Sequence, residues 1–214
     1  MSQFIFLLTL CGALLLSGCA KHKSYDYTAF RASKPASILV LPAENSTPDI
    51  NAANSFISGV TKPLAEAGYY VFPVAVVDET FKHNGLTNAH DVRTVSLAKL
   101  RDIFNADAVL YIDVSQYGSK YRVVDSMTEV AASAKLVDLR NGSTLWQGTS
   151  FASDQNNNSN NSLLGIVVGA VVKHVANNIT DESHKIALRA ADLLFATNDQ
   201  GGLLPGPRRH LSGG

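Results

Sequence analysis

The residues with the most specific chemistry in this chain are Leu16-Ser17-Gly18-Cys19, which end a short apolar run that begins at Phe4. They have the pattern of a bacterial lipobox, in which a signal peptidase cuts before the cysteine and the thiol carries an acyl chain. The run is shorter than the roughly 20 apolar residues needed to span a bilayer, and it fits a signal peptide. We therefore expect removal of residues 1–18 and lipidation of Cys19. Because Met1–Phe6 contains no Lys or Arg, an ordinary secretory signal with a chance cysteine is the alternative.

The residue after Cys19 predicts which membrane holds the anchor. In proteobacteria an Asp at this position tends to retain a lipoprotein at the inner membrane, and this chain has Ala20. We therefore expect a lipid anchor in the outer membrane, with the protein facing the periplasm. The only other cysteine, Cys11, leaves with the signal peptide. The mature chain then has no catalytic cysteine, thiolate metal site or disulfide.

The residue types that serve in hydrolases and metal sites are present without a recognisable arrangement. None of the six histidines is paired at a metal-ligand spacing such as i, i+4. His83 and His90 share a predicted loop with Asp78, Glu79 and Asp91, but a solvated polar loop explains that group more simply. The chain has no Gly-x-Ser-x-Gly elbow and no glycine-rich phosphate or dinucleotide loop. We expect no catalytic residue, no metal and no cofactor.

Two further acidic residues stand where a ligand could bind. Glu44 and Asp49 follow the first predicted strand, and α/β folds often bind ligands at the carboxyl ends of strands. Loop solvation and helix capping are the simpler interpretation. The 18 basic and 18 acidic residues give zero net charge. That balance argues against nucleic acid as a partner and against a polybasic membrane patch.

The first half of the mature chain alternates between strand and helix signals. Ser37–Leu41 and Ala108–Val114 are apolar runs typical of strands covered on both faces. Between them, Thr47–Gly68 has helical spacing, with Thr47 expected as its cap and a kink expected at Pro63. Tyr69–Val77 predicts a second strand. Shorter helices are expected over Asp78–Asn84 and after Thr94, which is expected to be the cap of the second of them. This order predicts parallel strands joined by helical crossovers.

The second half predicts an antiparallel meander followed by a helix. Strand signals cover Tyr121–Val124, Glu129–Leu139 and Leu145–Phe151, and Asn141-Gly142 is a strong hairpin signal. The last helix is expected over Ile186–Phe195. The expected fold class is therefore α/β, a three-layer sandwich whose mixed sheet joins a parallel half to an antiparallel hairpin. We expect a tether over residues 19–36, a single domain over 37–200 and a flexible tail over 201–214.

The apolar segment Leu163–Val175 is the main candidate for a contact surface. On a helix, Gly165 and Gly169 would form a smooth strip that permits close approach of another helix. The segment is either a core helix packed on the sheet or an interface with a second subunit, a partner or the membrane surface. The possible interface residues are Leu163, Leu164, Gly165, Val168, Gly169 and Val172. Tyr69-Tyr70, Tyr117 and Tyr121 are further interface candidates, although strand propensity explains them equally well.

Three stretches of the chain carry a family resemblance. They are Pro63–Val74, Asp78–Phe81 with Asn84–Thr87, and Ala134–Arg140 continuing to Leu145–Gly148. These stretches resemble a family of bacterial lipoproteins without an assigned function, which includes a meningococcal lipoprotein studied as a vaccine antigen. The resemblance implies a fold similar to the N-terminal domain of TolB and to the CsgG secretion lipoprotein. It also implies a gene neighbourhood with a CsgG-like lipoprotein, and no catalytic residue is assigned in the family.

These observations favour a non-enzymatic envelope lipoprotein that is a binding or assembly subunit of a CsgG-like export or transport complex. We expect it to form a homo-oligomer or to bind a CsgG-like lipoprotein through the Leu163–Val175 segment and the sheet edge. The alternatives are a periplasmic regulator of a peptidoglycan synthase and a hydrolase with an unrecognised site. Because the fold would be similar under all three hypotheses, the fold alone does not decide among them.

Overall fold

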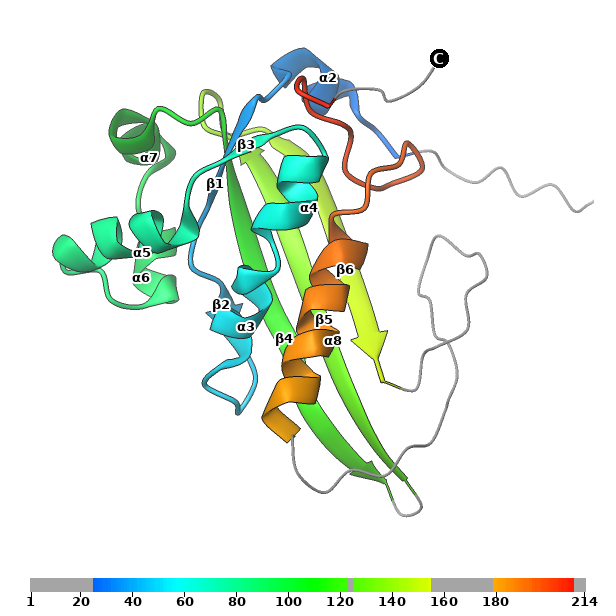
Figure 1. Cartoon of the computed structure of the whole chain (residues 1–214). Helices are drawn as coiled ribbons and strands as arrows, with labels where there is room; N and C mark the ends of the chain where they lie inside the picture. The colour runs from blue at the N-terminus through cyan, green and yellow to red at the C-terminus, as the bar shows by residue number, and fades with distance from the viewer. Residues whose placement is uncertain (1–24, 123–124, 155–178, 210–214) are drawn as a thin grey trace, which may run out of the picture.

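A six-stranded mixed sheet forms the centre of the molecule (Figure 1). The computed structural model describes residues 25–122, 125–154 and 179–209. The parallel part comprises β1 (Ser37–Val40), β2 (Glu44–Asn45), β3 (Tyr70–Val71) and the first half of β4 (Ala108–Arg122). β4, β5 (Asp125–Asp138) and β6 (Thr144–Ser153) pair antiparallel. The order β3-β1-β4-β5-β6, with β2 also paired to β4, confirms the predicted mixed sheet.

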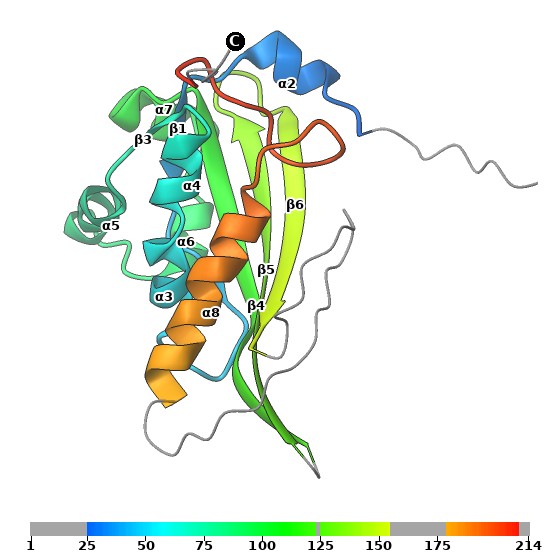
Figure 2. The same cartoon turned by 45° about the vertical axis from the view of Figure 1, so that its right-hand side comes forward.

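Helices cover both faces of the sheet, which confirms the three layers (Figure 2). One layer holds α3 (Ala52–Ser58), α4 (Thr61–Glu66) and α8 (Ile179–Leu194), and the other holds α5 (Val74–His83), α6 (Ala89–Arg93) and α7 (Leu97–Phe104). Successive residues of β1 enter opposite cores, Ile38 the core on the side of α3, α4 and α8 and Leu39 the core on the side of α5, α6 and α7. Because side chains of a strand alternate between faces, a strand buried on both sides must be apolar throughout.

The helix predicted over Thr47–Gly68 is interrupted earlier than expected. It consists of α3 and α4, which are separated at Gly59 and Val60. Pro63 is the third residue of α4 and lacks the N–H that would bond the carbonyl of Gly59, so the break falls one turn before the proline. Thr47 is not the helix cap: its hydroxyl accepts from the Asp49 N–H at 3.3 Å, and α3 begins only at Ala52.

Two further local predictions are wrong. The strand predicted over Tyr69–Val77 contains only Tyr70 and Val71, because Pro73 ends the extended segment and α5 starts at Val74. The apolar residues after Pro73 instead follow a helical period, with Val77 and Phe81 buried one turn apart. Thr94 ends α6, and Ser96 caps α7 by accepting from the Lys99 N–H at 3.3 Å.

The predicted tether and tail are largely part of the folded domain. α2 (Thr28–Ser33) lies within the expected tether, and the ring of Tyr27 before it is buried. The Tyr27 hydroxyl donates to the Gly202 carbonyl at 2.5 Å and accepts from the Gly201 N–H at 3.0 Å. Leu203 is buried, and the Gly206 N–H donates to the Ala67 carbonyl at 2.7 Å. The prediction of a flexible chain is therefore wrong for residues 25–36 and 201–209. The Tyr27 side chain in the first segment forms hydrogen bonds with backbone groups of the second segment.

Candidate protein interface at the sheet edge

The main sequence-predicted site residues lie outside the residues that the structure describes. These are the lipobox Leu16, Ser17 and Gly18, the lipidation site Cys19, and the possible interface residues Leu163, Leu164, Gly165, Val168, Gly169 and Val172. Their roles stay predictions. The described residues contain the acidic and histidine candidates and an edge of the sheet, and these can be compared directly.

Glu44 belongs to an ion-pair network that attaches α6 to the sheet. Arg93 places Nη1 3.0 Å from Oδ1 of Asp113 and 3.5 Å from Oε2 of Glu44. His90 Nδ1 lies 3.4 Å from the other Glu44 oxygen. The Arg93 guanidinium also lies over the Tyr111 ring, 5.6 Å from its centroid. The Glu44 carboxylate already lies close to the Arg93 guanidinium. Glu44 therefore helps to hold α6 against the sheet.

The other acidic and histidine candidates are not gathered into a metal site. Asp49 accepts from the Asn51 N–H at 2.8 Å, which is a local turn contact. His83 is exposed and lies 3.9 Å from Glu79 on the same helix. Among the described residues, no group of three or more His, Cys, Asp or Glu is placed to hold a metal ion. The expectation that the whole protein needs no metal stays a prediction.

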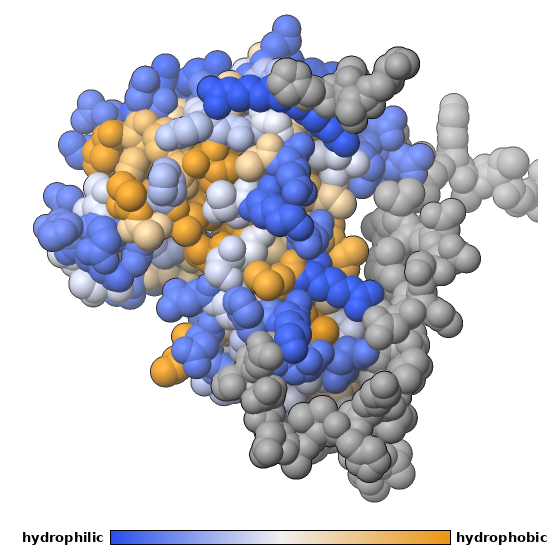
Figure 3. All heavy atoms as spheres, viewed as in Figure 1, coloured by the Kyte–Doolittle hydropathy of each residue, from blue (hydrophilic) through white to orange (hydrophobic). Residues whose placement is uncertain are grey.

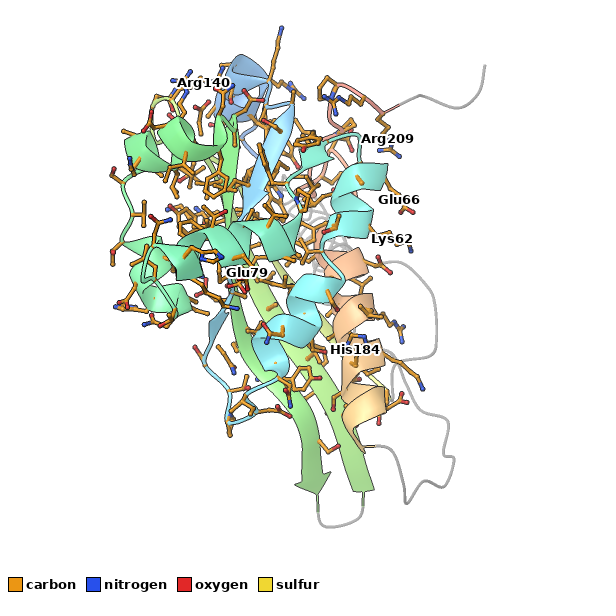
Figure 4. The ribbon with its side chains drawn as sticks, turned by 60° about the vertical axis from the view of Figure 1, so that its left-hand side comes forward. Lys62, Glu66, Glu79, Arg140, His184 and Arg209 are labelled. Atoms are coloured by element: carbon orange, nitrogen blue, oxygen red, sulfur yellow. The ribbon has the colours of Figure 1, made fainter. Side chains whose placement is uncertain are left out.

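A hydrogen-bonded group that the sequence did not reveal joins three elements of the fold. Ser55 on α3 lies 2.7 Å from Nδ1 of His184, on α8, and accepts from the Tyr117 hydroxyl of β4 at 2.9 Å. His184 is labelled in Figure 4. Because Ser55 is buried and its oxygen already has two partners, this serine–histidine pair is suited to packing rather than to nucleophilic attack. The residues are separated by 62 and 129 positions, so no local motif could have identified them.

Replacing Ser55 by alanine is expected to lower the free energy of unfolding by about 1–2 kcal/mol. The substitution leaves the hydroxyl of Tyr117 and Nδ1 of His184 without their shared partner. Urea unfolding followed by circular dichroism measures the change. Ser58, which is exposed on the same helix, provides the matched control, since Ser58→Ala leaves the three-residue group intact. An equal loss in both variants would contradict a stabilising role for the group.

Apolar side chains are exposed around β3 at one edge of the sheet. Tyr70 is 43% exposed, Val76 on α5 is 60% exposed and Ile103 on α7 is 43% exposed. The Tyr70 ring lies 5.0 Å from Phe72, whose ring lies 6.1 Å from Phe104. Figure 3 shows apolar side chains gathered over this part of the surface. We call Tyr70, Phe72, Val76 and Ile103 the edge patch.

The backbone of β3 is also available at this edge. The N–H groups of Tyr70 and Phe72 donate to the carbonyls of Ala36 and Ile38, at 2.9 and 3.3 Å. Because alternate residues of a strand direct their backbone groups to opposite sides, those of Val71 point away from β1. No described strand pairs with that side of β3. An unpaired strand edge next to exposed apolar side chains has the chemistry of a protein-binding surface.

The edge patch has charged borders of opposite sign. Arg208 lies over the Tyr70 ring, 5.6 Å from its centroid, and Arg209 follows it. On the α5 border stand Asp78 and Glu79 with one cation between them, since Nζ of Lys82 lies 2.5 Å from Asp78 and 3.5 Å from Glu79. None of the described helices is both long and apolar enough to cross a membrane. The structure thus presents an apolar edge between a basic border and a border on which two acids share one lysine.

The comparison with known families decides the relationship suggested by the sequence. The family model described as "Putative lipoprotein GNA1162-like" matches residues 25–208. The chain belongs to the GNA1162-like lipoprotein family. A relative in this family, the lipoprotein NMB1124/NMB1162 of Neisseria meningitidis serogroup B strain MC58, is 50% identical over 204 residues, which are 94% of this chain and 95% of the relative. Membership in the GNA1162-like family confirms the resemblance and fits anchoring to a membrane of the cell envelope.

A solved structure agrees with the family assignment. The crystal structure of lipoprotein GNA1162 from Neisseria meningitidis is 54% identical, covers 59% of this chain and 88% of its own, and has a TM-score of 0.54. The PelC dodecamer from Paraburkholderia phytofirmans is 16% identical, covers 77% of this chain and 91% of its own, and has a TM-score of 0.43. The likeness to PelC is too slight to bear on function or assembly. The family match includes residues 25–36 and 201–208, which agrees with their packing in the domain.

Proposed function

We propose that this protein is a non-enzymatic binding or assembly subunit of the cell envelope, anchored at the periplasmic face of the outer membrane. The observation that carries the proposal is the edge patch, where Tyr70, Val76 and Ile103 are exposed and one side of β3 pairs with no described strand. Soluble domains usually protect strand edges and seldom expose a contiguous apolar group without a binding role. In this function the folded domain supplies a docking surface, and the chemistry of the complex resides in another protein.

The occupant of the edge patch is a second copy of the chain. In an isologous contact the same surface meets itself, so each border faces the opposite border of the partner. Arg208 and Arg209 would then face Asp78 and Glu79 across the interface, and Arg209 and Glu79 are both labelled in Figure 4. The open side of β3 would pair with its own copy. The resulting assembly is the unit that joins an export or transport complex with a CsgG-like lipoprotein.

The variants Val76→Lys and Ile103→Lys are expected to weaken self-association at least about tenfold, because each places a charge within the apolar contact. Ile50→Lys is the matched control, since Ile50 is 85% exposed and lies outside the edge patch. The mature lipidated protein is purified in detergent, and its mass is measured by sedimentation. A monomeric wild-type protein, or equal association in all variants, would contradict the proposal.

Crosslinking of the intact envelope tests the assembly in which the protein takes part. We expect a CsgG-like lipoprotein to co-purify with the wild-type protein and to be lost with Val76→Lys. Recovery of a peptidoglycan synthase in its place would favour the regulatory alternative. The Ile50→Lys protein again serves as the control, because it should recover the same partner as the wild type.

A further inference from the structure

Val71 is the one residue of β3 whose backbone groups face away from β1. The N–H groups of Tyr70 and Phe72 bond β1, so the N–H and C=O of Val71, which lies between them, point outward. Neither group of Val71 has a hydrogen-bond partner among the described residues. The Val71 side chain, in contrast, packs against the core on the side of α3, α4 and α8. Val71 therefore presents its backbone, rather than its side chain, at the edge of the sheet.

The backbone on either side of Val71 is already occupied. The Tyr69 N–H donates to the Leu64 carbonyl at 3.2 Å, which closes the turn after α4. Pro73 has no N–H, and its carbonyl accepts from the Val77 N–H at 3.1 Å in the first turn of α5. A strand that adds to this edge can therefore form a complete hydrogen-bonded pair only with Val71.

A second copy has the same single unpaired residue, which restricts how the two edges can meet. Donors face acceptors when the two strands run antiparallel about a two-fold axis perpendicular to the sheet. With the axis between the two Val71 residues, each N–H donates to the carbonyl of the other. An axis at Tyr70 would set Val71 opposite Tyr69, whose N–H is already bonded. An axis at Phe72 would set it opposite Pro73, which has no N–H.

The register centred on Val71 also brings the aromatic side chains of the edge patch together. Tyr70 of one copy and Phe72 of the other would form a non-hydrogen-bonded pair, in which the Cα atoms lie about 4.5 Å apart. Aromatic pairs of this kind stabilise antiparallel sheets. Since the strands run in opposite directions, Arg208 beside the start of one β3 would approach the end of the other, where α5 with Asp78 begins.

We propose that two copies join through β3 with Val71 on the two-fold axis, so that one continuous sheet runs through both. The reciprocal backbone hydrogen bonds fix the orientation of the second copy, whereas the apolar edge patch supplies most of the affinity. This inference rests on the self-contact of the proposed function. It adds the register of the contact, which exposed apolar side chains alone do not determine.

Val71→Pro removes the N–H that is bonded only across the interface and keeps an apolar side chain. Because that N–H has no described partner within the chain and edge strands tolerate proline, the urea midpoint should stay within about 0.5 M of the wild type. Self-association of the mature lipidated protein in detergent, measured by sedimentation, should weaken at least about tenfold, since both interface hydrogen bonds are lost. Val71→Ala keeps the N–H and is the matched control, which should associate within about twofold of the wild type.

Mixed disulfides test the register without proline. Tyr70→Cys and Phe72→Cys each add one thiol to a mature chain whose other cysteine, Cys19, is predicted to carry the acyl group. Under mild oxidation a mixture of the two variants should form at least about fivefold more disulfide-linked dimer than either variant alone, because residues 70 and 72 of opposite copies come within disulfide range and identical positions do not. Wild-type protein treated in the same way is the blank for Cys19.

The outcomes separate the register from the proposed function. A protein that loses association with Val76→Lys but keeps it with Val71→Pro would overturn the register and leave the edge patch in place. Disulfide-linked dimers of Tyr70→Cys alone would also overturn it, since they require an axis at Tyr70. If Val71→Pro lowers the urea midpoint further than expected, the mixed disulfide decides. A monomeric wild-type protein would overturn both the register and the self-contact.

Discussion

Replacing Trp146 by alanine is expected to lower the free energy of unfolding by about 3–5 kcal/mol. The side chain is 1% exposed, its ring centroid lies 6.0 Å from Phe195, and it fills the core between β6 and α8. Its Nε1–H also donates to the Gly201 carbonyl at 3.0 Å, which fixes the segment after α8. The substitution therefore creates a cavity and releases a long-range backbone contact. Urea unfolding measures the loss.

The neighbouring glycine provides an independent check of this packing. A Cβ at Gly148 would lie 2.3 Å from Cζ2 of Trp146, which is closer than real side chains allow. Gly148→Ala should therefore displace the indole and also destabilise the domain by about 1–3 kcal/mol. Trp146→Phe is the milder control, because it retains a ring and loses only the N–H and part of the volume. A loss below about 1 kcal/mol for Trp146→Ala would contradict this role.

The second large effect is expected at Asp138, whose carboxylate is fully buried. Although burial by itself raises the pKa of Asp138, hydrogen bonds from Arg140 and Ser33 outweigh it and hold the pKa at about 2. Arg140 donates Nη2–H to Oδ2 at 2.6 Å, and the Ser33 hydroxyl donates to the same oxygen at 2.5 Å. The carboxylate thereby joins α2 to the β5–β6 turn. We expect Asp138→Asn to destabilise the domain by about 2 kcal/mol at neutral pH.

The pH dependence of this effect has a definite sign. A carboxyl group whose pKa is lower in the folded state than in the unfolded state stabilises the fold. This stabilisation is complete at pH values at which the group is ionised in both states. That contribution is complete above the ordinary pKa of 3.8 and is lost as the pH falls toward about 2. The difference in unfolding free energy between wild type and Asp138→Asn should shrink by about 1 kcal/mol between about pH 6 and about pH 3. A difference that stays constant over this range would argue against a charged Asp138 in the fold.

Local patterns in the sequence predicted most of the sheet. The apolar runs at Ser37–Leu41 and Ala108–Val114 form β1 and the start of β4, because strands covered on both faces need apolar residues at successive positions. Asn141-Gly142 predicted the β5–β6 turn, where Gly142 has a φ of 74° and the Asn141 side chain accepts from the Ser143 N–H at 2.9 Å. The alternation of side chains along a strand and the conformation of a short turn depend only on residues that are neighbours in the chain. Such features can therefore be predicted from the sequence.

The sequence could not locate groups assembled from distant segments. Ser55, Tyr117 and His184 come from separate elements. Residues 201–209 have the glycine-rich composition of a tail, yet Tyr27, Trp146 and Tyr69 bond their backbone carbonyls. Such contacts follow from which elements pack together, which no local period encodes.

By itself, the sequence determined the family, the predicted anchor at Cys19 and the strand and helix signals that produce three layers. Only the tertiary structure decided which apolar residues stay exposed at the β3 edge and where the charges lie. Folding brings Tyr70, Val76 and Ile103 to one edge although they lie on three different elements, and which side chains stay exposed depends on that spatial arrangement.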